Sequence, residues 1–402
     1  MITKMKFGIV FLLLLSTAGT AQKKLTFKAD KKLIKTIDQN FRDGAEQYKG
    51  QVKNLLPGKF PKTFFSETGK FEYSNSGWWC SGFYTGTLLY LYEQTKDPAL
   101  LNAATGLLDS LQREQYNTRT HDLGFMMYCS FGNAHRMAPD PLYEEILINS
   151  AKSLSRRFNT TVGCIKSWNS QVADDYLVII DNMMNLKLLF WATQTTGDSS
   201  FYKIASTHAN TTIKNHFRDD YSSYHVINFN STDGSVKAKR TAQGAADGSA
   251  WARGQAWGLY GFTEAYRETR DQKYLDQANH IADFILTHPN LPGDKIPYWD
   301  FNAPGIPNAL RDASAAAIMA SALIELSGYA DGKTGKKYMT VAETILRTLS
   351  LPQYKAAAGT NGGYIIKHGV GHMPNKTEID VPLTYADYYF VEAMKRYKEL
   401  SK

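Results

Sequence analysis

Two aspartates stand out because their neighbours in the sequence are almost all apolar. Asp122 lies in HDLGF, directly before the run LGFMMYCSF, and Asp181 interrupts the apolar run LVIIDNMMNLKLLFW over residues 177–191. A buried carboxylate costs free energy unless it is paired or used, and burial raises its pKa toward the range of a general acid. Paired carboxylates are what sugar-cleaving chemistry commonly requires. Asp122 taken alone could instead be a helix N-cap.

Aromatic and basic side chains suited to a flat anionic ligand accompany the aspartates. Trp79 in WWCSGFYTG and Trp168 in KSWNS could stack on a sugar ring, although Trp79 could equally plug one end of the fold. Arg253 and Trp257 are four residues apart in WARGQAWGLYG, so they would share one helical face and place a cation beside a ring. An arginine that merely stacks on an aromatic side chain is the structural alternative. Three further polar candidates are His121, His225 and Gln243.

Other catalytic chemistries find no support in the sequence. The chain contains no GxSxG elbow, P-loop, Rossmann glycine pattern or HExxH motif. His368 and His372 in HGVGH indicate a polar loop rather than a metal site. Asp300 and Asp312 are interpreted as caps of late segments. We therefore expect no metal and no cofactor.

The elements that must position these residues are predicted to be helices, because apolar residues recur at intervals of three and four in one segment after another. A repeated Thr-x-Asp pattern, with an alanine seven residues beyond the aspartate, marks turns at Asp97, Asp198 and Asp271, where the aspartate would cap the next helix. The predicted helices lie near residues 31–48, 82–94, 98–115, 122–131, 141–157, 177–195, 199–217, 251–268, 271–287, 312–327, 335–350 and 382–399.

Twelve helices in consecutive hairpins favour an all-α (α/α)6 barrel, since each hairpin can bury its apolar face only against its neighbours. An open solenoid is the competing topology. In a closed barrel, the loops at one end form a bowl that would gather the candidate residues. With 402 residues, of which 43% are hydrophobic and 21% charged, the chain can build one large core, and disordered, collagen-like and coiled-coil classes are excluded.

The N-terminus predicts export. Two lysines, the apolar run from Phe7 to Leu15 and the small residues that end at Ala21 are typical of a secretory signal peptide, so residues 1–21 would be removed and 22–402 would form one catalytic domain. Loss of two lysines lowers the formal charge from +8 to +6, which suits an anionic ligand. No basic run indicates nucleic acid, and no long apolar segment indicates a membrane span in the mature chain.

The cysteines do not predict a disulfide framework. There are three, an odd number, at Cys80, Cys129 and Cys164, and their spacing does not match a metal site. One pair could still form in an oxidising compartment. We expect a monomer or a small homo-oligomer.

The motifs HDLGF, IIDNMMN, SAWARGQAW and DYYFVEAM, in this order, resemble the unsaturated glucuronyl hydrolases of glycoside hydrolase family 88 from about residue 70 to 395. The resemblance implies an (α/α)6 barrel that removes a 4,5-unsaturated uronic acid from the non-reducing end of glycosaminoglycan oligosaccharides made by polysaccharide lyases. It implies that Asp181 is the general acid and base and that Asp122 holds the sugar and keeps Asp181 protonated. It also implies a set of residues around the unsaturated sugar, namely His121, His225, Gln243, Arg253 and Trp257, with Trp79 and Trp168 stacked on it.

The resemblance implies hydration of the C4=C5 vinyl ether rather than substitution at the anomeric carbon. Export together with a substrate that lyases produce suggests the periplasm of a glycan-degrading bacterium, although a signal peptide does not distinguish the periplasm from the medium. Three alternatives remain at this point. An unsaturated rhamnogalacturonyl hydrolase would act on pectin fragments, an exported sugar-binding protein would not need Asp181, and a sugar epimerase would want two histidines at C–H reach.

Overall fold

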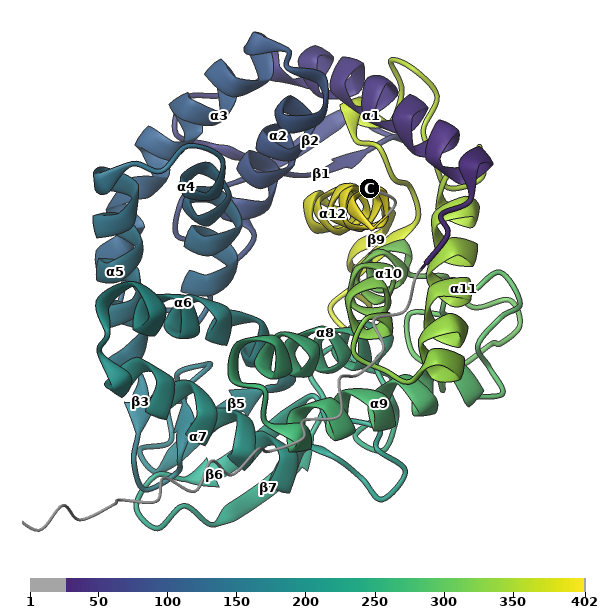
Figure 1. Cartoon of the computed structure of the whole chain (residues 1–402). Coiled ribbons are helices and arrows are strands. Elements are labelled where there is room, and N and C mark those ends of the chain that lie inside the picture. The colour runs from purple at the N-terminus through teal and green to yellow at the C-terminus, as the bar shows by residue number, and fades with distance from the viewer. Residues whose placement is uncertain (1–26, 401–402) are drawn as a thin grey trace, which may run out of the picture.

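The computed structural model describes residues 27–400, so the predicted signal peptide lies outside the described residues. Two rings of helices form the barrel, which Figure 1 shows along its axis. The inner ring consists of α2 (Ser81–Thr95), α4 (Asn133–Met137), α6 (Leu186–Thr196), α8 (Ala252–Thr269), α10 (Ala313–Ser327) and α12 (Thr384–Glu399). The outer ring consists of α1 (Lys31–Val52), α3 (Pro98–Leu111), α5 (Pro141–Ser155), α7 (Ser199–His216), α9 (Gln272–Thr287) and α11 (Gly332–Leu349). Because α12 packs against α2, the ring is closed and the solenoid alternative is wrong.

The sequence explains which helices lie inside. The inner helices α8, α10 and α12 are buried almost along their whole length, whereas the outer helix α1 buries one face. The Thr-x-Asp turns are confirmed, because each aspartate side chain accepts from a backbone N–H of the helix that follows. The alanine seven residues beyond each aspartate lies inside the following helix and is fully buried, as close helix packing requires.

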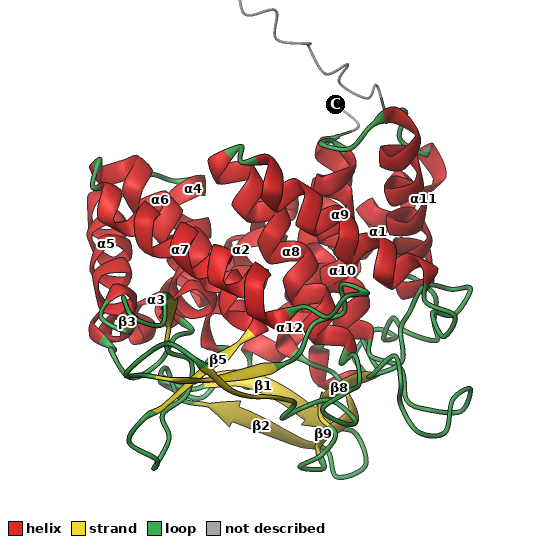
Figure 2. Ribbon diagram, turned by 90° about the horizontal axis from the view of Figure 1, so that it is seen from below, coloured by secondary structure: helices red, strands yellow, loops and turns green. Residues whose placement is uncertain are grey.

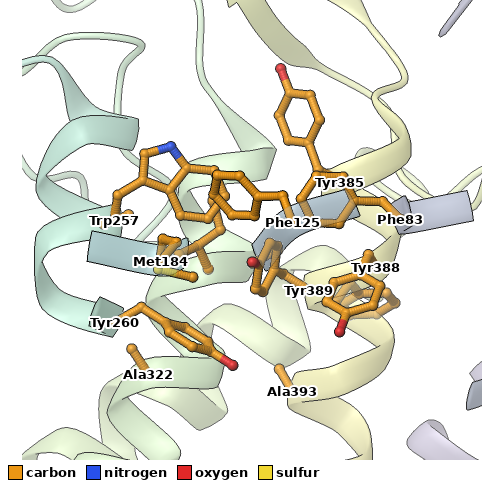
Figure 3. Close-up of a cluster of buried hydrophobic side chains, with 14 of the residues drawn as sticks. Phe83, Phe125, Met184, Trp257, Tyr260, Ala322, Tyr385, Tyr388, Tyr389 and Ala393 are labelled. Atoms are coloured by element: carbon orange, nitrogen blue, oxygen red, sulfur yellow. The ribbon is translucent and has the colours of Figure 1, made fainter. Parts of the chain in front are cut away.

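Aromatic side chains fill the middle of the barrel, as Figure 3 shows. The ring of Phe125 packs 5.3 Å from Phe83 and 5.1 Å from Trp257, and Trp257 packs 5.3 Å from Tyr389. These contacts are in the range where aromatic pairs stabilise a core beyond simple burial. Packed aromatic side chains thus fill this part of the barrel interior, and the candidate site lies next to them.

Short strands, which the sequence analysis did not predict, gather at one end of the helices in Figure 2. They form two-stranded sheets β1–β2, β3–β4 and β8–β9 and one three-stranded antiparallel sheet in the order β5-β6-β7. Their bounds are β1 Phe60–Phe65, β2 Lys70–Ser74, β3 Phe158–Asn159, β4 Cys164–Ile165, β5 Asp175–Ile179, β6 Val226–Asn230, β7 Val236–Arg240, β8 Gly369–His372 and β9 Thr377–Val381.

Two predicted helices differ in form from the structure. The helix predicted over 177–195 begins instead with strand β5, passes through a 3-10 turn, η3 (Ile180–Asn185), and becomes α-helical only at α6. The apolar residues 177–179 pair with β6, which explains the error, because short apolar runs fit a strand as well as a helix. The helix predicted over 122–131 is a π-helix, η2 (Gly124–Gly132), that runs into α4.

Two remaining short elements are 3-10 turns, η1 (Gln112–Tyr116) and η4 (Asn361–Gly363). All three cysteines are free thiols. Within residues 27–400, none of the helices combines the length and the apolar character that crossing a bilayer demands.

Candidate active site

Asn185 joins the two aspartate segments. Its Oδ1 accepts from the backbone N–H of Phe125 at 2.9 Å, and its Nδ2 lies 3.5 Å from Asp122 Oδ1. A Cβ on Gly124 would lie 2.4 Å from the Cα of Asn185, so glycine is required for this close approach. The segment after Asp122 therefore lies directly against the 3-10 turn that carries Asp181, as the prediction of paired carboxylates requires.

Asp122 is buried among polar neighbours. Its Oδ2 accepts from Thr120 Oγ1 at 3.2 Å, and His121 Nε2 lies 3.2 Å from its Oδ1. Burial raises the pKa of Asp122 to about 7, although Thr120, Asn185 and the charge of Arg157 act in the opposite direction. Burial also lowers the pKa of His121 to about 3, so the imidazole is neutral at pH 7 and this contact is not an ion pair. Since the carboxylate accepts from side chains and not from a helix amide, the N-cap alternative is wrong.

Asp181 sits in the first turn of η3, immediately beyond the end of β5. Burial raises its pKa to about 7, the charge of Arg253 and the indole of Trp257 offset part of the rise, and the like charge of Asp122 adds to it. Its Oδ2 lies 3.6 Å from His225 Nε2. The pKa of His225 falls well below its ordinary value, mainly through burial, so this ring is neutral too.

The loop after β7 orients His225. The backbone N–H groups of Ala242 and Gln243 both donate to His225 Nδ1 at 3.2 Å. Because Nδ1 accepts, the ring proton is on Nε2, the nitrogen that faces Asp181. The indole Nε1 of Trp257 faces the carboxyl of Asp181, and neither this atom nor Asp181 Oδ2 has another hydrogen-bond partner in the protein. These groups can therefore bind polar atoms of a ligand.

Arg253 contacts a different ring from the one predicted. Arg253 and Trp257 both lie on α8 as predicted, but the guanidinium lies 4.5 Å from the ring of Trp251 and 5.3 Å from that of Tyr385, so the arginine stacks on other aromatic side chains. The side chain is only 1% exposed and donates to Asp312 Oδ2 and to the backbone carbonyls of β8. Arg253 thus fastens the β8–β9 hairpin and acts on Asp181 through its charge.

The remaining predicted site residues are Gln243, Trp79 and Trp168. Gln243 Nε2 donates to the carbonyl of Gly371 at 3.0 Å, which ties its loop to the same hairpin. Trp79 is partly exposed and packs 4.9 Å from Tyr385, and Trp168 packs edge-on to His225 at 5.6 Å. Both tryptophans are therefore partly accessible. Trp168 lies beside the histidine that faces Asp181, and Trp79 lies 5.7 Å from Phe125 in the segment that follows Asp122.

The cap predictions have different outcomes. Asp312 is the N-cap of α10, with its Oδ1 accepting from Ser314 N at 3.0 Å, and it is also the partner of Arg253, which the sequence did not reveal. Asp300 caps no helix: its buried carboxylate accepts from Ala245 N and Ser249 Oγ and holds the loop before α8. Among the described residues, no three His, Cys, Asp or Glu side chains are grouped to hold a metal ion.

The sequence and the fold are both similar to those of known proteins. Residues 52–400 match Glycosyl Hydrolase Family 88. A protein of Formosa agariphila named unsaturated glucuronyl hydrolase is 48% identical over 324 residues, which is 80% of each chain. The crystal structure of an unsaturated glucuronyl hydrolase specific for heparin is similar, with a TM-score of 0.88, 45% identity and coverage of 91% of this chain and 97% of that one. A Streptococcus agalactiae unsaturated glucuronyl hydrolase variant complexed with dGlcA-GalNAc6S gives a TM-score of 0.77 at 28% identity, covering 91% of both chains.

Proposed function

Because the chain belongs to Glycosyl Hydrolase Family 88, we propose that it is an unsaturated glucuronyl hydrolase, which removes the 4,5-unsaturated uronic acid from the non-reducing end of glycosaminoglycan oligosaccharides. The observation that carries the proposal is the aspartate pair, Asp122 and Asp181. Asp122 is buried and the side chain of Asp181 is only 13% exposed, burial raises the pKa of each carboxyl to about 7, and Asn185 holds their segments together. A pKa near neutrality suits a group that must give a proton and take one back.

Asp181 is the acid and base of the proposed reaction. The C4=C5 bond of the unsaturated sugar is a vinyl ether, so its electron pair takes the proton of Asp181 at C4 and leaves a cation at C5 that the ring oxygen stabilises. Water adds at C5 and returns a proton to the ionised Asp181. The resulting hemiketal opens to a ketone at C5, and the hemiacetal formed at C1 expels the rest of the oligosaccharide as an alcohol.

The neighbours of Asp181 bind and orient the sugar. Neutral His225 presents its Nε2 proton beside Asp181 Oδ2, and the indole N–H of Trp257 is a second donor that faces the same carboxyl. The partly exposed rings of Trp79 and Trp168 offer faces on which a sugar can stack. Asp122 keeps the proton on Asp181 by like-charge repulsion. The buried guanidinium of Arg253 attracts the uronate carboxylate through its charge.

Loss of ultraviolet absorbance from the conjugated enol-ether acid tests the proposal directly. Unsaturated disaccharides from chondroitin, hyaluronan and heparin should lose this absorbance with the wild-type protein. Asp181→Asn should lower the rate at least 10³-fold, because it removes the only proton donor proposed for C4. Its control is Asp109→Asn, a change at an exposed residue of the outer helix α3, which should leave the rate unchanged. No absorbance loss with any disaccharide would refute the function, and loss with pectin fragments alone would favour a rhamnogalacturonyl hydrolase.

We also propose that the chain is exported to the periplasm. The support is the sequence of residues 1–21, with its lysines, apolar run and small residues before the expected cleavage after Ala21. Fractionation of cells that express the full chain, followed by N-terminal sequencing, should find a periplasmic protein that starts at Gln22. A cytoplasmic protein that keeps Met1 would contradict this.

A further inference from the structure

A row of buried polar side chains on the outer helix α7 faces the segments that carry the candidate site. The row consists of His208, Thr212 and His216, which are spaced four residues apart and therefore lie along one face of the helix. Helix α7 packs against β4 and against η3, the turn that carries Asp181. The row is thus in a position to hold this turn from behind.

One link runs from His208 to the turn. His208 Nδ1 accepts from the backbone N–H of Ile165 at 3.0 Å. The carbonyl oxygen of Ile165 accepts from Asn182 Nδ2 at 2.9 Å, and Asn182 directly follows Asp181 in the chain. Because the N–H and C=O groups of one residue in a strand point to the same side, the imidazole of His208 and the amide of Asn182 lie next to each other at β4.

A second link runs from His216 to the strand before the turn. His216 Nε2 lies 3.2 Å from the carbonyl oxygen of Val178, three residues before Asp181. Burial lowers the pKa of His208 to about 3 and that of His216 to about 4, so both rings are neutral at pH 7. Because a carbonyl oxygen only accepts, the ring proton of His216 is on Nε2 and its Nδ1 is an acceptor. In His208 the roles are reversed, since Nδ1 accepts and Nε2 carries the proton.

Four buried polar atoms in this region have no hydrogen-bond partner among the residues that the structure describes. They are one donor, one hydroxyl and two acceptors, namely His208 Nε2, Thr212 Oγ1, His216 Nδ1 and Asn182 Oδ1. Buried polar atoms are almost always paired with protein or with ordered water. The set carries no charge and mixes a donor with acceptors, so an ion would satisfy only part of it, whereas water both donates and accepts.

The hydroxyl of Thr212 is not used by its own helix. The buried threonines Thr87 on α2 and Thr263 on α8 each donate to the carbonyl oxygen four residues earlier, at 2.9 Å and 2.7 Å. Thr212 is buried to the same extent but makes no such bond, so its hydroxyl is left for a partner outside α7. It lies about one helical turn from each histidine, between the donor of His208 and the acceptor of His216.

We propose that these four atoms bind buried water, and that this water, held by Thr212, positions the turn that carries Asp181. The inference rests on the proposed function, because the exact position of the turn matters for catalysis only if Asp181 is the acid. Water at this place completes the hydrogen bonding of Asn182, whose amide is otherwise held only through Nδ2. The carboxyl beside Asn182 is then fixed through both ends of the neighbouring amide, and Thr212 is a positioning residue.

Thr212→Val tests the proposal, with Thr212→Ser as the rescue variant and Thr263→Val as the matched control. If the hydroxyl binds water, its loss leaves buried polar atoms unpaired and the Tm should fall. A hydroxyl that has no partner would instead cost free energy in the wild type, so valine would raise the Tm. In Thr212→Val, kcat on an unsaturated disaccharide should fall about tenfold at unchanged KM, because a small displacement of the acid slows proton transfer. Thr212→Ser should keep kcat near the wild-type value, and so should Thr263→Val, which loses only a bond within its own helix.

A second readout does not depend on activity. A crystal structure of the wild type should show ordered water within hydrogen-bond distance of Thr212 Oγ1 and of at least one of the other three atoms. No water at this place, a Tm that rises in Thr212→Val, or a kcat that stays at the wild-type value would each overturn the proposal. If Thr212→Val does not fold, the wild-type structure still decides, because a site without water overturns the proposal. A wild type without activity refutes the proposed function alone, since the water and the Tm are measured without substrate.

Discussion

At the scale of single residues, the site consists of the buried carboxyl of Asp122 and the largely buried carboxyl of Asp181, and both can exchange a proton near neutral pH. Each pKa is raised to about 7 mainly by burial, and the like charge of Asp122 adds to the pKa of Asp181. Two interacting groups of this kind titrate in two steps that belong to the pair. The reaction requires the state with one proton, so kcat/KM should have a bell-shaped pH profile centred near neutrality.

Asp122→Asn should move the alkaline limb of this profile to lower pH. The variant removes the negative charge that raises the pKa of Asp181, so Asp181 loses its proton at lower pH. The residual kcat/KM, measured on an unsaturated disaccharide between pH 5 and 9, checks the shift. Asp109→Asn in α3 is distant from the pair in the fold and should leave both limbs in place. An alkaline limb that stays at its wild-type pH in Asp122→Asn would show that the two carboxyls do not interact.

At the scale of elements, the site depends on the close packing of η2 on η3. Gly124→Ala should lower both stability and kcat, because the new Cβ would lie 2.4 Å from the Cα of Asn185 and backbone would have to move. Such overpacking costs roughly 1–3 kcal/mol of unfolding free energy. Urea denaturation and disaccharide turnover measure the two effects.

Gly106→Ala in α3 is the matched control. No heavy atom lies within 4 Å of a Cβ at this position, and the residue is in a regular helix, so alanine should stabilise the protein by about 0.5–1 kcal/mol and leave kcat unchanged. Equal behaviour of the two variants would contradict the close-packing argument.

The sequence predicted the helices and none of the strands, and one physical reason explains both outcomes. Helices can be predicted from the local spacing of apolar residues. Strand β5, by contrast, is a short apolar run that is recognised only through its partner β6, about fifty residues later in the chain. Asp122 and Asp181 could be found because each interrupts apolar sequence. Asp312 could not be found as a site residue, because its importance comes from a partner, Arg253, that only the fold brings near.

At the scale of the whole molecule, one carboxylate ties the inner ring together. Glu392 on α12 accepts from Tyr90 on α2 at 3.1 Å, from Tyr260 on α8 at 2.8 Å and from Ser321 on α10 at 2.6 Å. Figure 3 shows Tyr260 below Trp257 and Met184 in the aromatic cluster. Burial alone would raise the pKa of Glu392, but Arg396, Lys187 and these hydrogen bonds hold it below its ordinary value.

Glu392→Gln should therefore destabilise the whole barrel by roughly 3 kcal/mol, because an amide N–H₂ replaces an acceptor that buried hydroxyls require. The pKa of Glu392 is lower in the folded state, so its contribution is fully present above the unfolded pKa and is lost as pH falls through the folded value. Thermal unfolding between pH 3 and 7 should show a smaller loss on acidification in Glu392→Gln than in the wild type. The exposed change Glu145→Gln on α5 should leave both the stability and its pH dependence unchanged, and a Glu392→Gln curve that matches this control would show that the inner ring closes without the carboxylate.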